Sequence, residues 1–121
     1  MKCRIDSLYI CVSDMKRAVH FYETFFDQPV TEYDDTYSVF DIDGFRFGLF
    51  AFETVNEKHV FGSNCLPSIS FDSLDVLKTK LEGKKICFPL TKIKENWVAE
   101  FIDSEGNHIE ITAPIKTDTD I

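Results

Sequence analysis

The sequence predicts an α+β fold in which one βαβββ unit is used twice. VFDIDGFRFGLF from Val39 aligns with FIDSEGNHIEIT from Phe101 at a shift of 62 positions, and Ser7 to Asp14 aligns with Ser68 to Asp75 at a shift of 61. Two shifts that differ by one residue indicate a duplicated unit with one small insertion. We therefore expect a single domain, 1–121, divided into module one (3–52), a linker (53–64), module two (65–113) and a C-terminal tail (114–121).

Module one is predicted to begin with a strand from Cys3 to Val12, followed by a helix. Asp14 is a suitable N-cap, and apolar residues then recur at helical spacing to about Phe26. Gln28-Pro29 ends this helix, because proline cannot continue it. Three short strands follow, at about 30–33, 37–42 and 45–52, and Asp43-Gly44 forms the turn between the last two.

Module two is predicted to repeat this order after the polar linker. A strand at 66–72 precedes a short helix from about Leu74 to Glu82, and Gly83 closes that helix with a left-handed cap. The next strand, 86–90, contains Pro89 and is therefore expected at a sheet edge or a bulge. Lys116 to Ile121 is expected to be a frayed tail.

The last two strands, 97–102 and 108–112, are predicted to form a hairpin. The turn between them carries Gly106 and Asn107, which tolerate positive φ. After the turn, His108, Glu110 and Thr112 alternate with two isoleucines, so one face is polar and the other apolar. This strand is expected to carry function on its polar face.

Composition narrows the classes of function. Hydrophobic residues make up 44% of the 121, with 12 phenylalanines, which supports a packed core. A formal charge of −8 argues against a nucleic-acid partner and is compatible with neutral or cationic small ligands. The N-terminal stretch MKCRIDSLYICVSD contains no apolar run that would span a membrane, so we expect a cytoplasmic protein without membrane contact.

The four cysteines form no CxxC pair. They lie in predicted strands or beside the linker, so buried thiols are favoured over zinc ligands or disulfides. The residues concerned are Cys3, Cys11, Cys65 and Cys87.

Two motifs carry a resemblance to a known family. LYICVSDMKRAVHFY followed by GFRFGLF, and FIDSEGNHIEI near the C-terminus, resemble the vicinal oxygen chelate superfamily of glyoxalases, bleomycin-resistance proteins and dioxygenases. The resemblance extends from about Ile5 to Thr112. It implies two βαβββ modules whose curved mixed sheets surround a cup, often completed by a second chain. We therefore expect a homodimer.

The resemblance also implies where a metal ion would bind. In metal-dependent members, a side chain on the first strand of each module and a carboxylate on the last strand hold the ion; the corresponding residues here are Ser7, Ser68, Glu110 and, by pseudo-symmetry, Gly48. Only Glu110 is a strong ligand, and one carboxylate does not hold an ion alone. We therefore predict that the protein binds no metal and no cofactor. His108 lies two residues before Glu110 on the same predicted face, and a metal would bind only if its imidazole nitrogen served as a ligand from this displaced position.

Strand alternation predicts the lining of the cup. The candidate ligand-binding residues are Ser7, Tyr9, Arg46, Phe50, Phe52, Ser68, Ser70, Trp97, His108 and Glu110. Trp97 belongs to this surface together with Ala99 and Phe101 only if the register holds, because a slip of one residue moves all three to the other face. Glu110 is the best catalytic candidate, and an ion pair with Arg46 is its structural alternative.

Three functions follow from this lining. The first is a metal-free binding protein of the bleomycin-resistance type that takes an aromatic or cationic small molecule. The second is a superfamily enzyme, a glyoxalase-like lyase or isomerase or a dioxygenase, with a non-standard or partner-completed site. The third is a dimeric interaction module whose aromatic side chains fill the cup.

Overall fold

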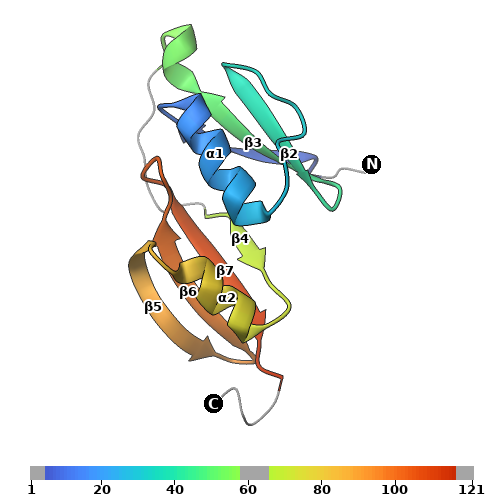
Figure 1. Ribbon diagram of the computed structural model, residues 1–121, viewed down its shortest axis with the longest axis vertical. Helices are drawn as coiled ribbons and strands as arrows, with labels where there is room; N and C mark the ends of the chain where they lie inside the picture. Colours follow the sequence, from blue (N-terminus) through green and yellow to red (C-terminus); the bar gives the residue numbers. More distant parts are fainter. Residues whose placement is uncertain (1–4, 58–65, 117–121) are drawn as a thin grey trace. The chain divides into compact units, whose positions relative to one another are not determined.

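The computed structural model describes residues 5–57 and 66–116. The chain divides into two compact units, Met1–Phe61 and Gly62–Ile121, and each contains a mixed sheet with one α-helix against it (Figure 1). The elements are β1 (Ser7–Val12), α1 (Met15–Phe26), β2 (Tyr37–Ile42), β3 (Phe45–Ala51), the 3-10 helix η1 (Phe52–Val55), β4 (Ser68–Ser70), α2 (Leu74–Leu81), β5 (Lys85–Ile93), β6 (Asn96–Ile102) and β7 (His108–Pro114). The predicted α+β class is confirmed.

In unit one, β3 lies between β1 and β2. It pairs in parallel with β1 and antiparallel with β2, through a turn in which Asp43 and Gly44 both have positive φ. The α1 helix begins at the predicted cap, where the Asp14 side chain accepts a hydrogen bond from the Arg17 backbone N–H at 3.1 Å. The helix packs on β3 through its apolar stripe, which includes the fully buried Tyr22. One face of this sheet is therefore core.

The strand predicted at 30–33 does not form. Its place is taken by a single bridge between Glu32 and Val39, at which the backbone N–H groups of Thr31 and Glu32 both donate to the Val39 carbonyl. The Asp34 carboxylate accepts hydrogen bonds from the backbone N–H groups of Thr36 and of the following residue at 2.9 and 3.2 Å. This side-chain turn competes with a regular ladder and ends the pairing after one bridge.

In unit two, the strand order is β4-β7-β6-β5, so the proline-containing β5 is an edge strand as predicted. The α2 helix is capped by Ser73, packs on β7 and is followed by Gly83 with φ 72°. Buried Ile109 and Ile111 face the core from β7, opposite Phe101 and Ala99 of β6. No helix within the two described ranges is long and apolar enough to cross a membrane.

The turn between β6 and β7 is built around buried Asp103. One oxygen of its carboxylate accepts hydrogen bonds from the backbone N–H groups of Glu105 and Asn107, both at 2.8 Å. Gly106 has the predicted positive φ of 95°. Asn107 does not have positive φ; its side-chain amide instead donates to the second Asp103 oxygen at 3.3 Å. This network fixes the point at which β7 begins.

Several segment ends differ from the predictions, including those of three strands in unit two. The β4 strand is shorter than 66–72, β5 extends to Ile93, and β7 includes Pro114, which was assigned to the tail. Residues 58–64 of the predicted linker and 117–121 of the predicted tail lie outside the described residues.

Candidate functional site

The open face of the unit-one sheet brings four predicted residues together. The register pairs Ser7 with Arg46, and Cys11 with Phe50, in the parallel ladder between β1 and β3. Tyr9 lies between these pairs on the same face, because successive side chains of a strand alternate. These residues lie on the side of the sheet opposite the core side formed by Ile10, Val12 and their neighbours.

Three rings form an aromatic cluster on this face, consisting of Tyr9, Tyr37 and Phe50. The Tyr9 ring meets Tyr37 edge-on at a centroid distance of 5.9 Å and Phe50 at 5.5 Å, and Tyr37 lies 6.3 Å from Phe50. Edge-to-face pairs at these distances are favourable. Tyr9 remains 48% exposed, so the cluster borders solvent in unit one.

Gly48 makes room for this cluster. A Cβ atom at Gly48 would overlap the Tyr37 hydroxyl and would lie 2.7 Å from its Cζ and 3.0 Å from the Tyr9 Cβ. The position that pseudo-symmetry makes equivalent to Glu110 is therefore covered by a tyrosine ring. Burial raises the pKa of Tyr37, Arg46 opposes this shift, and Tyr9 adds to it.

Arg46 is paired with Glu32 rather than left as an isolated cation. The guanidinium Nη2 lies 2.6 Å from the Glu32 carboxylate, and this contact raises the pKa of Arg46. The two side chains are 44% and 58% exposed, so the pair positions Arg46 more than it stabilises the fold. Beside it lies an open depression of about 480 Å³, lined by Ile5, Asp6, Ser7, Gly44 and Arg46.

Phe52 does not belong to this surface. The prediction extended β3 through Phe52, but the strand ends at Ala51 and Phe52 begins the 3-10 helix. Phe52 is only 7% exposed, which places its ring in the core. The Thr54 hydroxyl donates to the Ala51 carbonyl at 2.7 Å, a local bond that favours the turn over a continued strand.

In unit two, Ser68, Ser70 and Glu110 lie on the polar face as predicted. The parallel ladder between β4 and β7 pairs Ser68 with Glu110, and Ser70 with Thr112. The Ser68 hydroxyl donates to Glu110 Oε2 at 2.5 Å. Glu110 thus has a hydroxyl donor from its own unit.

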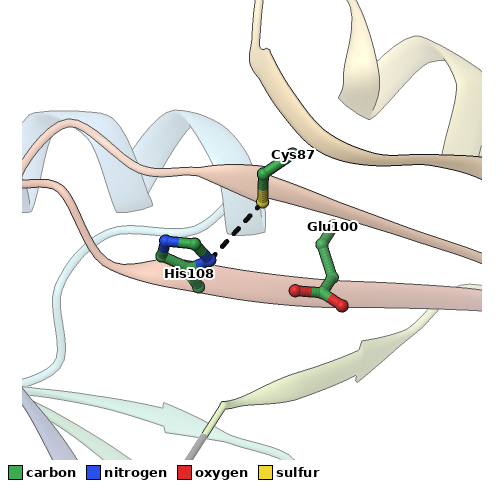
Figure 2. A group of neighbouring side chains, drawn as sticks. All are labelled: Cys87, Glu100 and His108. Carbon is green, nitrogen blue, oxygen red and sulfur yellow. Dashed lines mark hydrogen bonds between the residues drawn. The ribbon is translucent and has the colours of Figure 1, made fainter. Parts of the chain in front are cut away.

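A second group on this face consists of Cys87, Glu100 and His108, one from each of β5, β6 and β7. The Cys87 Sγ and His108 Nδ1 lie 3.6 Å apart, and the thiol, imidazole and carboxylate donor atoms all lie within 4.8 Å of one another (Figure 2). Burial and the nearby Glu100 carboxylate raise the pKa of the Cys87 thiol, partly offset by Lys85. An unassisted thiolate nucleophile is therefore disfavoured here.

The prediction that Cys87 is a buried thiol is wrong, because the residue is exposed. The register between β5 and β6 shifts between Ile86, which pairs with Phe101, and Phe88, which pairs with Glu100. Cys87 is the extra residue of this bulge, and bulges characteristically redirect a side chain. The bulge at an edge strand explains why the thiol reaches the polar face.

Trp97 lies on the opposite face from Glu110, so its predicted place beside the polar residues is wrong. The ladder pairs Trp97 with Ala113, and Ala99 with Ile111, all on the buried face. The Trp97 indole Nε1 is buried and, within the described residues, has no hydrogen-bond partner, and Lys92 Nζ lies 5.5 Å from the ring centroid. The sequence left the register of this strand open. The observed register places Trp97, Ala99 and Phe101 on the face opposite the polar residues.

Sequence reasoning missed Tyr37, Cys87 and Glu100. Tyr37 could have been predicted from the sequence, because the Asp43-Gly44 turn fixes the pairing of Tyr37 with Phe50 in the β2–β3 hairpin. Cys87 and Glu100 could not be predicted, because Pro89 indicated only a sheet edge or a bulge, and the side chain that a bulge redirects depends on the register between β5 and β6.

The comparisons with known proteins agree with this architecture. The model of the Glyoxalase/Bleomycin resistance protein/Dioxygenase superfamily matches residues 4–83, about two-thirds of the chain, and the chain belongs to that superfamily. No curated protein matches the sequence.

Solved structures share the fold at low sequence identity. A glyoxalase-related enzyme from Fulvimarina pelagi aligns with a TM-score of 0.74 at 13% identity, covering 95% of this chain and 94% of that one. A glyoxalase/bleomycin resistance protein from Albidiferax ferrireducens aligns with a TM-score of 0.75 at 15% identity over 92% and 98%. A glyoxalase/bleomycin resistance protein/dioxygenase family enzyme from Burkholderia phytofirmans gives 0.72 at 15% identity over 91% and 98%.

Proposed function

We propose that the chain is a small-molecule-binding protein whose ligand is an aromatic or cationic compound held on the open face of unit one. The observation that carries this proposal is the aromatic cluster of Tyr9, Tyr37 and Phe50, whose rings are fixed against one another around Gly48. Fixed rings offer a flat ligand stacking surface at little cost in side-chain entropy. The depression beside Arg46 supplies polar groups that would orient the ligand.

Charge favours a cationic ligand. The chain carries a formal charge of −8, and ring faces attract cations by about 0.5–2 kcal/mol. Arg46 contributes little repulsion, because Glu32 neutralises it at 2.6 Å.

Binding of this kind needs no metal at the positions used in metal-dependent relatives. In unit one these positions are Ser7, whose hydroxyl is a weak ligand, and Gly48, whose missing side chain is replaced by the Tyr37 ring. In unit two they are Ser68 and Glu110, which hydrogen-bond to each other. We therefore propose that binding at unit one involves neither a metal nor catalysis.

Paired probes test the proposal. We expect benzyltrimethylammonium to stabilise the protein in thermal-shift assays and to bind more tightly than neutral benzyl alcohol. Tyr9→Leu and Phe50→Leu should each weaken binding at least fivefold. Phe45→Leu is the matched control, because Phe45 is an exposed ring of the same strand on the opposite face. Equal binding by all three variants, or none by the wild-type protein, would refute the proposal.

A second candidate function, a superfamily enzyme with a non-standard metal site, is favoured by one observation. Cys87, Glu100 and His108 present three metal-binding side chains away from the usual positions. A glyoxalase-like lyase or isomerase, or a dioxygenase, would require such an ion. Turnover that depends on added metal and is lost in His108→Ala would favour this candidate over binding alone.

We also propose a homodimer, since half-exposed rings such as Tyr9 would be covered by a second copy. Under this proposal the partner leaves room for the ligand. A dimer in which the probes above do not bind would instead favour the interaction module.

A further inference from the structure

The cluster of Cys87, Glu100 and His108 lies entirely within unit two and shares no residue with the aromatic cluster of unit one. Its members are brought together by three neighbouring strands, β5, β6 and β7. Glu100 pairs with Glu110 across the β6–β7 ladder, which makes His108 its diagonal neighbour on the same face. Figure 2 shows the Cys87 thiol directed at the His108 ring, with the Glu100 carboxylate beside them.

The donor types match the preferences of zinc. Thiolate, imidazole and carboxylate all bind Zn²⁺, and three protein ligands with one open position are the usual set of a reactive site. Metal–ligand bonds of about 2.0–2.3 Å in a tetrahedron place donor atoms roughly 3.5 Å apart. The Cys87 Sγ and His108 Nδ1 already lie 3.6 Å apart. The largest separation in the group is below 4.8 Å, so closing it requires a movement of about 1 Å, within reach of a glutamate side chain.

The charges around the cluster also favour a cation. Glu100 and Glu110 are directly opposite each other on one face, and like charges in that position are destabilising. A divalent ion beside Glu100 would offset this repulsion. It would also favour the Cys87 thiolate, whose proton is released to solvent on binding. Cys87 is exposed, so an ion reaches the thiol from solvent without rearrangement of unit two.

We propose that Cys87, Glu100 and His108 form a binding site for a divalent ion of the zinc type, with a fourth coordination position open to water or a small ligand. The site uses none of Ser7, Gly48, Ser68 or Glu110, the positions that the family resemblance assigns to a metal. It does not depend on ligand binding at unit one.

The test is a metal titration of the full chain after removal of metals by a chelator. We expect one equivalent of Zn²⁺ to bind with micromolar or tighter affinity, measured by competition with a chromophoric chelator. Co²⁺ should produce a thiolate-to-metal charge-transfer band in the near ultraviolet. Cys87→Ser should remove this band and weaken zinc binding at least tenfold, and His108→Ala should weaken it to a similar extent. Glu100→Gln should have a smaller effect in the same direction.

Matched controls separate this site from other thiols and carboxylates. A variant with Cys3→Ser, Cys11→Ser and Cys65→Ser retains only Cys87 and should bind zinc as the wild-type protein does. Glu110→Gln should leave the cobalt band in place. Unfolding followed by Trp97 fluorescence verifies that each variant keeps unit two folded.

Two outcomes would overturn the proposal. One is the absence of stoichiometric binding by the wild-type protein. The other is binding that survives in folded Cys87→Ser and His108→Ala but is lost in Glu110→Gln or in the triple cysteine variant, which would place the ion elsewhere.

Discussion

Replacing Asp103 with alanine should destabilise unit two selectively. The Asp103 carboxylate is 6% exposed and accepts backbone hydrogen bonds from Glu105 and Asn107, both at 2.8 Å. Hydrogen bonds to a charged acceptor contribute about 1.5–3 kcal/mol each. Because Gly106 at the tip of the turn is exposed, water can reach part of the vacated space. We therefore expect the free energy of unfolding to fall by about 3 kcal/mol, near the lower end of the summed contribution of the two hydrogen bonds.

Urea unfolding monitored by tryptophan fluorescence measures this loss. The chain has a single tryptophan, Trp97, and it lies near the start of β6, at the end of the strand away from the turn, so the signal reports the unfolding of unit two. Asp103→Asn retains an acceptor oxygen without the charge and should lose about half as much stability.

The internal repeat supplies the control for this experiment. Asp41 occupies the equivalent turn position in unit one, but it is exposed, and its side chain accepts a single backbone hydrogen bond, from Gly44 at 2.9 Å, within the described residues. Asp41→Ala should therefore cost unit one less than about 1 kcal/mol. This loss is measured by far-ultraviolet circular dichroism, which reports both units, because Trp97 reports unit two. Equal losses in Asp103→Ala and Asp41→Ala would refute the reasoning that burial of the acceptor sets the cost.

Three further predictions concern the aromatic cluster and assembly. Gly48→Val should force the Tyr37 ring out of the cluster, because even a Cβ overlaps its hydroxyl, and should weaken binding of benzyltrimethylammonium at least tenfold while circular dichroism remains unchanged. Since the pKa of Tyr37 is raised in the folded protein, its contribution to stability is complete below the ordinary tyrosine pKa of about 10 and is lost as pH rises through the folded-state value. Tyr37→Phe should therefore lessen the decline in melting temperature at alkaline pH, and an identical decline in both proteins would contradict the assigned cause. Light scattering should give a dimer mass that falls to that of the monomer on dilution, and Tyr9→Lys should shift this equilibrium toward monomer; a monomer at every concentration would remove the dimer.

Most local structure was predictable from the sequence because its causes are local. The α1 helix begins after Asp14, whose side chain caps the helix as predicted. The Asp43-Gly44 turn and Gly106 adopt the backbone conformations that their residue types favour. The missing strand at 30–33 also has a local cause, the Asp34 side-chain turn, but the β-forming residues around it obscured that signal.

The face on which a candidate residue lies was predictable where alternation along its own strand decides it. Tyr9, Arg46 and Phe50 share the predicted face of unit one. In unit two, the repeat would align Arg46 with His108 and therefore pair Ser68 with His108, whereas the structure pairs Ser68 with Glu110. Because the two registers differ by two residues, each side chain stays on its predicted face of the sheet. The observed register also brings the Ser68 hydroxyl to Glu110. Pairing between distant strands depends on packing along the whole sheet, which no short motif encodes.

The sequence by itself determined the α+β class, the duplicated unit, the two helices and the polar face of β7, because caps, turns and alternation act within a few residues. Tertiary structure alone decided that Trp97 faces the core and that Cys87 meets Glu100 and His108. The physical reason is that shifting the pairing of two strands by one residue moves every side chain to the other face of the sheet. A single bulge introduces or cancels such a shift, and the β-propensity of the strand's residues does not change.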